Sequence, residues 1–436
     1  MLSNILNQSL WLDEATSILA ARDLNFGEII TKFSPGDFHP PLYYFLLKIW
    51  ISSFGASEAA ARMPSVLFGL ATVYLVYLIG SKLFSKKVGI LSASLLLTAP
   101  LHFYYMLEAR MYSMETFLAT LLVWLFIQRK WLYFTFTGAL LAYTDYLPLL
   151  VFIPLFIAAK NDKKLLTKLL KSSLGVALLL LPWLPTFVTQ LQTGIQVKEN
   201  APLWWKTLGK TNGKQLLLVP IKFMMGRITF SNKGIYAVFV LFYFAAFAAP
   251  FVNAVKYLSK TKFVLYWLIV PLIGASLMGI LMSGFAYFRL LFLLPAFYIL
   301  IACGIASAKP NLQKLFASLL IFLNTLAIGI YLTNPRLHKE DWREAVHYVE
   351  QNSNGNAASV FVTNNQRDPY IYYSKSVPSS GPQLLDNVSV QKLWFFRYVQ
   401  PIFDPEEKVK AKIEGLGYTK AKEHDFNGIV VWEYTK

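Results

Sequence analysis

The chain has 436 residues, of which 56% are hydrophobic and 15% are charged, whereas an ordinary soluble domain carries about 25% charged residues. Its formal net charge is +17, but the basic residues gather in short loops between apolar runs, so we expect membrane topology rather than nucleic acid to explain the excess. The single cysteine, Cys303, lies in an apolar run and excludes an intramolecular disulfide and a cysteine-based metal site.

The first 59 residues hold several polar groups ahead of the first long apolar run. Two adjacent carboxylates, Asp13 and Glu14, stand beside a Trp-Leu pair in "SLWLDEATSILA". Further along, "FHPPLYYFLLKIW" places His39 directly before two prolines, at the mouth of a helix that we expect to begin near Pro40 because proline suits a first helical turn. That helix is amphipathic and rich in Tyr and Trp, so we expect it to lie in the membrane interface rather than to span.

Apolar runs of about twenty residues recur after this segment, and this is the length that crosses about 30 Å of hydrocarbon. They predict a polytopic α-helical membrane protein with about ten spans. The expected spans are 60–82, 88–106, 113–128, 131–144, 146–159, 167–188, 235–253, 263–283, 288–307 and 313–332. The fourth and fifth spans are short and are divided by "TDYLP", so one long helix is the alternative there.

Lysine and arginine occupy alternate loops between the expected spans. They cluster at 82–87, 129–130, 160–171 and 256–262, whereas the loops between these hold few or mixed charges. This positive-inside pattern fixes orientation. It predicts an integral protein of the plasma (inner) membrane whose N-terminal segment, remaining loops (190–233 among them) and C-terminal tail face the external side.

The tail differs in kind from the spans, because it is charged and broken by turns. Its segments predict helices at "DWREAVHYVEQ" and "DPEEKVKAKIEGL" and strands at "ASVFVT" and "GIVVWEY". We therefore expect three parts, which are an external segment with interfacial helices and the acid pair (1–59), a transmembrane domain (60–332) and a small external α/β domain (333–436).

Further charges stand at the external ends of spans. "LEARMYS" holds Glu108 and Arg110, and "AYFRLLFLLP" holds Arg289 with no acid nearby in sequence. A charge at the centre of a span costs about 2.5–3.5 kcal/mol on insertion scales, so such groups usually face a cavity or a partner.

Each of these polar groups has a structural alternative. Asp13 or Glu14 can serve a helix terminus, where acids are favourable. Arg289 can snorkel to the interface, His39 can serve packing alone, and the acid and arginine of "LEARMYS" can form an ion pair. However, all these groups gather on one face of the membrane. A pair of acids, a histidine and two arginines there suits an anionic, phosphate-bearing lipid substrate.

The motifs "LWLDEATS", "HPPLYYFLLKIW", "GASEAAARMPSVLFGLATVYLVYLIGSKLF" and "LEARMYSM", taken in this order, resemble the GT-C superfamily of membrane glycosyltransferases. The closest branch is the family 39 protein O-mannosyltransferase and aminoarabinose transferase group with its bacterial relatives. The resemblance is dense over residues 9–130, and beyond them it consists of a hydrophobicity pattern, Arg289 and "DWREAVHYVEQ". The order of the motifs is specific, whereas each motif alone is weak.

The resemblance implies an enzyme that moves a sugar from a polyprenyl-phosphate carrier to an acceptor hydroxyl on the external face. The acceptor is a lipid, a protein or a glycan, and the sequence does not decide among them or identify the sugar. Members usually carry one spanning helix just ahead of the acid pair, so we expect a leading span to be missing from this chain. The alternative is that the first apolar span directs insertion of what lies ahead of it.

The resemblance also implies roles for the acids. Asp13 is the expected general base, which takes the proton of the acceptor hydroxyl in a single displacement with inversion. Glu14 orients the site or the capping backbone, or binds the acceptor. Glu108 stabilises oxocarbenium character at the anomeric carbon.

Cations and tyrosines complete the expected site. The donor phosphate meets His39, Arg289 and Arg110, the last of which pairs either with Glu108 or with phosphate. Expected sugar or lipid contacts are Tyr43, Tyr44 and Tyr105.

No metal ligand is assigned from the sequence. In the aminoarabinose branch an acid precedes the basic group that matches His39, and Phe38 stands at that place here. A divalent metal stays open as a cofactor, although the chemistry does not require one, because cationic side chains can stabilise the leaving phosphate.

Two other classes of function are compatible with the composition. A lipid-linked sugar flippase or transporter would share the apolar spans, but it would show repeats with interrupted helices in both halves and polar groups near the midplane, and we find neither. A scaffold whose work is done by the tail is the third class, and the tail carries no nucleotide or metal motif.

Overall fold

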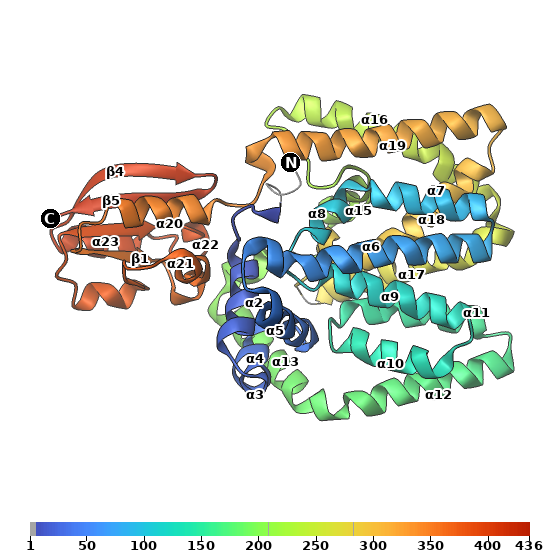
Figure 1. Cartoon of the computed structure of the whole chain (residues 1–436), viewed down its shortest axis with the longest axis horizontal. Coiled ribbons are helices and arrows are strands. Elements are labelled where there is room, and N and C mark those ends of the chain that lie inside the picture. The colour runs from blue at the N-terminus through green and yellow to red at the C-terminus, as the bar shows by residue number, and fades with distance from the viewer. Residues whose placement is uncertain (1–5, 208, 282) are drawn as a thin grey trace.

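The computed structural model describes residues 6–207, 209–281 and 283–436. A bundle of long helices forms most of the molecule, and a smaller region built around a β-sheet lies at one end of it (Figure 1). Between the two lie the short N-terminal elements α2 (Leu12–Asp23), α3 (Phe26–Glu28), η1 (Ile29–Phe33), α4 (Ser34–Asp37) and α5 (Leu42–Phe54). Helix α5 begins two residues after Pro40, as predicted.

The bundle follows in chain order. Its elements are α6 (Glu58–Leu83), α7 (Lys86–Leu97), α8 (Pro100–Met106), α9 (Tyr112–Ile127), α10 (Trp131–Ala142), η2 (Leu147–Val151), α11 (Phe152–Ala159), α12 (Lys163–Leu180), η3 (Leu181–Trp183), α13 (Leu184–Asn200), α14 (Pro202–Thr207), α15 (Gly213–Met225), α16 (Lys233–Lys256), α17 (Leu258–Leu281), η4 (Tyr287–Leu293), α18 (Leu294–Ala306) and α19 (Pro310–Thr333). The expected external loop 190–233 is therefore largely helical.

Each of the ten predicted spans coincides with helical structure, but their lengths differ. Within the described residues, six segments are long and apolar enough to cross a membrane, and α7 with α8, bent by 61°, gives a seventh if the pair forms one span. Helices α9, α10 and the η2–α11 segment are shorter. The alternative of one long helix across "TDYLP" is wrong, because α10 ends at Ala142 and η2 begins at Leu147.

Helix α18 forms the centre of the bundle. Every residue from Leu294 to Ile305 is buried, and the helix packs against α7, α16 and α17. The approach to α16 is so close that a Cβ at Gly304 would lie 1.7 Å from the carbonyl oxygen of Pro250. Glycine is therefore what lets these two backbones meet.

The C-terminal sheet region has five strands in the order β2-β1-β3-β5-β4. The strands are β1 (Ala357–Phe361), β2 (Ser379–Ser380), β3 (Lys392–Phe396), β4 (Thr419–Phe426) and β5 (Ile429–Thr435), and the helices are η5 (Pro335–Leu337), α20 (Trp342–Gln351), η6 (Asn364–Gln366), α21 (Asp368–Tyr373), η7 (Pro382–Asp386), α22 (Gln400–Phe403) and α23 (Lys408–Gly415). Strand β1 is parallel to β2 and β3, whereas β5 is antiparallel to β3 and β4.

Both faces of this sheet are covered, which explains why β1 and β3 read as continuous apolar runs. One face packs Trp342 and Phe361 together, and the other packs Val360 with Ile413. The predicted helix at "DWREAVHYVEQ" and the strands at "ASVFVT" and "GIVVWEY" are confirmed. The helix of "DPEEKVKAKIEGL" begins only at Lys408, and β3 and β4 were not predicted. The proposed domain boundaries stay a prediction.

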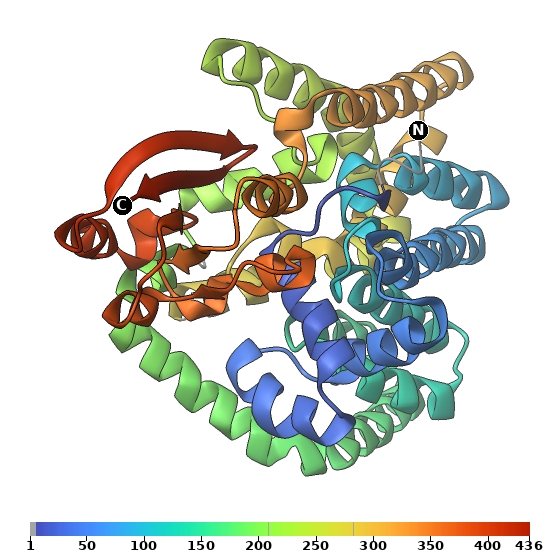
Figure 2. The same cartoon turned by 60° about the vertical axis from the view of Figure 1, so that its left-hand side comes forward.

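The sheet region lies against the first helices, as Figure 2 shows where its orange and red ribbons meet the blue ones. Tyr373 accepts a hydrogen bond from the backbone N–H of Leu10 at 2.9 Å, and Thr16 on α2 donates to Asp368 on α21 at 2.6 Å. The turns after α6 and α11, which carry lysines, lie at the opposite end of the bundle (Figure 1).

Candidate active site

Charged side chains gather where the bundle meets the sheet region. They come from α2, from the end of α4, from the 107–111 turn between α8 and α9, and from the connection between η5 and α20. The structure thus brings the acid pair and the "LEARMYS" motif together, although they stand about a hundred residues apart.

Glu14 is completely buried, and both of its carboxylate oxygens have hydrogen-bond partners. Arg62 of α6 donates to both of its oxygens, at 2.9 Å from Nε and 2.6 Å from Nη2, and the backbone N–H of Ala109 donates at 2.8 Å. The Lys339 ammonium lies 3.0 Å away. Burial works to raise the pKa of Glu14, but Arg62 and Lys339 outweigh it and hold that pKa at about 2. This geometry favours an orienting role over contact with the acceptor.

Asp13, the neighbour of Glu14, has the opposite surroundings. Its side chain is 40% exposed, and the nearest cation, Nη2 of Arg110, is 4.0 Å from Oδ2. Protein atoms nevertheless surround enough of the carboxylate to remove part of its hydration. Desolvation there raises the pKa of Asp13, which Arg110 opposes and Asp37 reinforces. An open carboxylate with a raised pKa has the properties of a general base.

Neither acid caps its own helix. The N-cap of α2 is Trp11, and no side chain accepts a hydrogen bond there. Glu14 instead accepts from the backbone of Ala109, in another element. The helix-terminus alternative is therefore wrong as to side-chain capping, whereas the placement of both acids in the first turn, where the helix dipole favours them, is confirmed.

Arg110 is almost fully buried beside Asp13. Its Nη1 donates to Ser17 Oγ at 3.1 Å and to the Tyr44 hydroxyl at 3.4 Å, while its Nε has no hydrogen-bond partner. Within the described residues it forms no ion pair with Glu108. The predicted alternative of an Arg110–Glu108 pair is therefore wrong, and Arg110 keeps donor capacity next to the open carboxylate.

His39 lies between two acids. Its Nδ1 is 2.9 Å from the Asp37 carbonyl oxygen and 3.2 Å from Asp37 Oδ2, and its Nε2 is 3.7 Å from Asp145 Oδ2. The left-handed backbone of Phe38, at φ 65°, makes the turn that brings Asp37 back onto the ring. Burial works to raise the pKa of Asp37, but His39 outweighs it and lowers that pKa. The histidine thus makes polar contacts and does not serve packing alone.

This trio does not fit a metal ion. Asp37 and Asp145 approach different nitrogens of the His39 ring rather than one point in space. Across the part of the chain that the structure describes, no three His, Cys, Asp or Glu side chains are placed to hold a metal.

Glu108 is buried with both oxygens lacking a hydrogen-bond partner. Its nearest countercharge is the Lys339 ammonium, 3.7 Å from Oε2. Burial is the main cause that raises the pKa of Glu108 to about 7, and Lys339 limits the rise. The side chain therefore titrates near neutral pH.

Arg289 lies in η4, half-buried, with its Nε buried and without a partner. In the described ranges it forms no ion pair, and its contact with a donor phosphate stays a prediction. Glu115 of α9 was not predicted. It is 1% exposed with one unpartnered oxygen, and an acid in an apolar run was the signal that could have found it.

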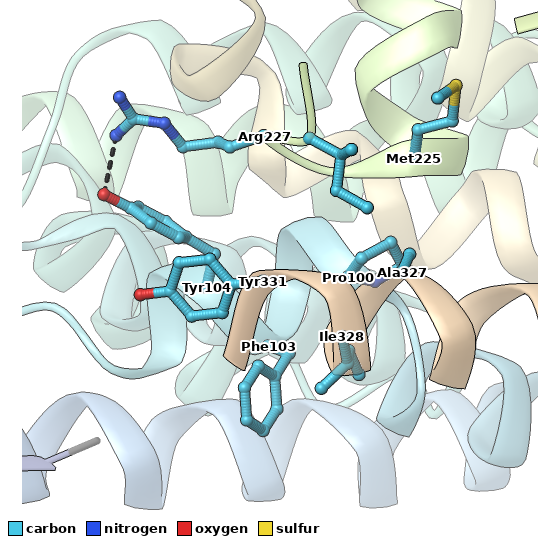
Figure 3. A pocket seen from close by; sticks show the side chains of 9 residues that line it. Pro100, Phe103, Tyr104, Met225, Arg227, Ala327, Ile328 and Tyr331 are labelled. Carbon is cyan, nitrogen blue, oxygen red and sulfur yellow. Dashed lines mark hydrogen bonds between the residues drawn. The ribbon is translucent and has the colours of Figure 1, made fainter. Parts of the chain in front are cut away.

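A narrow apolar crevice lies beside the site between α8, α15 and α19. Figure 3 shows Arg227 extending over it toward Tyr104, to whose hydroxyl it donates at 2.7 Å. Pro100, Met225 and Tyr331 also line the crevice. Arg227 was not predicted, because the motif "GRITF" around it carries no other charge.

The three expected contact tyrosines are buried. Tyr43 and Tyr44 are 0% exposed and Tyr105 is 4% exposed. Tyr44 donates to Asp37 and accepts from Arg110, so it links two members of the site. Contact of these rings with a sugar or a lipid stays a prediction.

Known proteins share this fold. Residues 38–188 match the family described as dolichyl-phosphate-mannose-protein mannosyltransferase. The crystal structure of ArnT from Cupriavidus metallidurans in the apo state superposes with a TM-score of 0.58 at 13% identity, over 99% of this chain and 95% of that one. The same protein bound to undecaprenyl phosphate gives 0.59 at 12% identity, over the same shares.

An uncharacterised protein of Aquifex aeolicus is 34% identical over 131 residues, which are 27% of this chain and 30% of the relative's length. The resemblance read from the motifs is confirmed at the level of the GT-C superfamily. The chain thus has the fold of the GT-C membrane glycosyltransferases, and its described residues include helices long and apolar enough to span a membrane.

Proposed function

We propose that this protein is a glycosyltransferase, which takes a sugar from a polyprenyl-phosphate carrier and transfers it, with inversion, to an acceptor hydroxyl. The observation that carries the proposal is the open Asp13 carboxylate, which has a raised pKa and lies 4.0 Å from the guanidinium of Arg110, whose Nε has no hydrogen-bond partner. The structural neighbour that binds undecaprenyl phosphate supports a donor of this class.

In the proposed reaction Asp13 accepts the proton of the acceptor hydroxyl as its oxygen attacks the anomeric carbon. The bond from that carbon to the phosphate oxygen breaks at the same time, and its electron pair remains on the polyprenyl phosphate. Positive charge must meet the negative charge that develops there. Arg289 is suited to this role because, within the part of the chain that the structure describes, it forms no ion pair and its Nε has no hydrogen-bond partner. Arg110 and His39 supply further donors.

We further propose that the site faces the external side of the plasma (inner) membrane. The lysine-bearing turns after α6 and α11 lie at the far end of the bundle (Figure 1), and such turns remain in the cytoplasm. The donor sugar would then be presented on the face where the sheet region lies.

The test is transfer by the purified protein from a defined polyprenyl-phosphate sugar, with Arg289→Ala as the variant. We expect the variant to raise the donor KM at least about tenfold, since hydrogen bonds to charged groups contribute roughly 1.5–3 kcal/mol. Arg22→Ala is the matched control, because Arg22 is exposed and, among the residues that the structure describes, its ion-pair partner is its neighbour Asp23. Unchanged donor KM and turnover in a folded Arg289→Ala protein would refute the phosphate role. Movement of lipid-linked sugar across vesicles without product would favour the transporter.

A further inference from the structure

Lys339 connects the sheet region to the buried acids of the bundle. It stands between η5 and α20, yet its side chain is only 4% exposed. The ammonium lies 3.0 Å from Glu14 Oε1 and 3.7 Å from Glu108 Oε2, so it bridges the two carboxylates. It also donates to the carbonyl oxygen of Leu107 at 3.4 Å.

The charges of this buried cluster balance only if Lys339 is counted. Glu14 and Glu108 are two acids, and Arg62 and Lys339 are two bases. Arg62 directs its hydrogen bonds to Glu14 and to backbone carbonyls, which leaves Lys339 as the nearest cation of Glu108. An uncompensated buried charge is strongly destabilising.

Other groups also face Glu108. The charged and titratable side chains whose electrostatic influence reaches it, or that it reaches, are Glu14 on α2, Tyr43 on α5, Tyr104 and Tyr105 on α8, Arg110 in its own turn, Tyr112 on α9, Arg227 after α15 and Lys339 itself. Among those with a favourable charge, Lys339 acts most strongly.

The sheet region holds the backbone of Lys339 in place. Asn427, at the turn between β4 and β5, donates from its amide to the carbonyl oxygen of Lys339 at 3.0 Å and to that of Pro335 at 3.2 Å. Arg343 of α20 also forms an ion pair, at 2.5 Å, with Glu58 of α6, and this pair holds the sheet region against the bundle. The position of the ammonium therefore depends on the docked sheet region.

We propose that Lys339 is a positioning residue for the transfer reaction, through which the docked sheet region keeps Glu14 and Glu108 ionised side by side beneath the catalytic Asp13. The proposal rests on the proposed function for its link to transfer, but the ion pairing on which it depends can be measured without activity. It makes the sheet region part of the catalytic unit rather than an appended module.

The first measurement is thermal stability in a double-mutant cycle of Lys339→Met and Glu108→Gln. We expect Lys339→Met to lower Tm, because it leaves the buried Glu108 carboxylate without its nearest cation. Glu108→Gln should restore much of the loss in that background, because it removes the unpaired negative charge. Lys392→Met is the control, since its ion pair with Glu433 lies inside the sheet region at 2.7 Å, and its effect should add to that of Glu108→Gln. Additive effects for Lys339 as well would overturn the proposal even if the enzyme transfers sugar normally.

The second measurement is the pH profile of transfer. The Glu108 carboxyl has a pKa of about 7, which Lys339 lowers from a higher value. The role proposed for Glu108 at the anomeric carbon requires its ionised form, so its titration contributes to the acidic limb together with that of Asp13. Lys339→Met should therefore move that limb to higher pH by about one unit, whereas Lys339→Arg should leave it near its original place. Asn427→Gly tolerates the left-handed backbone at φ 49° but loses the amide, and should shift the limb in the same direction by less.

These measurements separate two kinds of failure. An unmoved limb in both Lys339→Met and Asn427→Gly, with transfer intact, overturns the positioning role. Absence of transfer from every polyprenyl-phosphate donor by the unaltered protein overturns the proposed function, while the stability cycle still decides whether the pairing is real.

Discussion

Replacement of Asp13 by asparagine separates a catalytic base from a structural acid. Asparagine keeps the shape of the side chain but cannot take a proton. Proton transfer to a positioned carboxylate contributes typically 10²–10⁴-fold, which is about 3–5 kcal/mol of barrier. Stability should change little, because the side chain is 40% exposed and its nearest cation is 4.0 Å away.

Glu14→Gln should show the converse pattern. The substitution leaves Arg62 and Lys339 without their shared countercharge in a fully buried place. The pKa of Glu14 falls from its ordinary 4.5 to about 2, and at about 1.36 kcal/mol per unit this corresponds to roughly 3 kcal/mol. The figure agrees with the range of about 3–5 kcal/mol for breaking a buried ion pair.

The assay pairs initial rates of sugar transfer with Tm in the same detergent. Asp13→Asn should lose at least about 10² in kcat/KM at nearly unchanged Tm, while Glu14→Gln should lose Tm first. Near-normal turnover in Asp13→Asn would refute the base assignment. A far larger loss of turnover in a folded Glu14→Gln protein would mean that Glu14, not Asp13, is the base.

Three further outcomes test the topology, the electrostatics and the packing. A protease added to intact spheroplasts should cut the tail after Asn334 and spare the 160–171 turn. Cleavage of that turn with protection of the tail would show that the protein has the opposite orientation in the membrane. Because the folded-state pKa of Glu14 is depressed, its stabilisation is present above about pH 4.5 and is lost as pH falls toward 2. The Tm difference between the unaltered protein and Glu14→Gln should therefore shrink over that interval, and a constant difference would contradict the ion pair. Gly304→Ala should cost about 2 kcal/mol through overpacking, whereas Gly329→Ala, whose methyl group meets nothing within 4 Å, should be nearly neutral, and equal effects would refute the close approach of α16 and α18.

The helical part of the fold could be predicted because long apolar runs directly predict buried or lipid-facing helices. The span count could not, since α10 has only 12 residues, and length rather than composition decides whether it crosses. Strand β4 escaped prediction because "TKAKEHDF" is an exposed edge strand without an apolar face. Strand β3 was missed because five residues, "KLWFF", give no alternation to count.

The members of the site were easier to predict than their roles. Adjacent acids in a membrane protein, and a histidine before two prolines, are visible in the sequence alone. Their partners are not, because Arg62 lies 48 residues from Glu14 and Lys339 comes from near the other end of the chain. The sequence does not predict the contact of Asp37 with His39, because Phe38 separates the two residues and only a left-handed turn at Phe38 lets the Asp37 carboxylate reach the ring.

The division of labour between Asp13 and Glu14 follows from helix geometry. The side chains of neighbouring residues on an α-helix point about 100° apart. At the edge of a bundle, one side chain can therefore face the protein interior while its neighbour stays partly exposed. Glu14 faces inward, where Arg62 and Lys339 fix its charge, and Asp13 faces outward, where desolvation raises its pKa and a face stays open. Two carboxylates whose surroundings push their pKa values in opposite directions are the arrangement from which distinct catalytic roles can be assigned. Because Asp13 and Glu14 are adjacent in "WLDE", one short helix supplies both a buried, ion-paired carboxylate and a partly exposed one suited to act as the base.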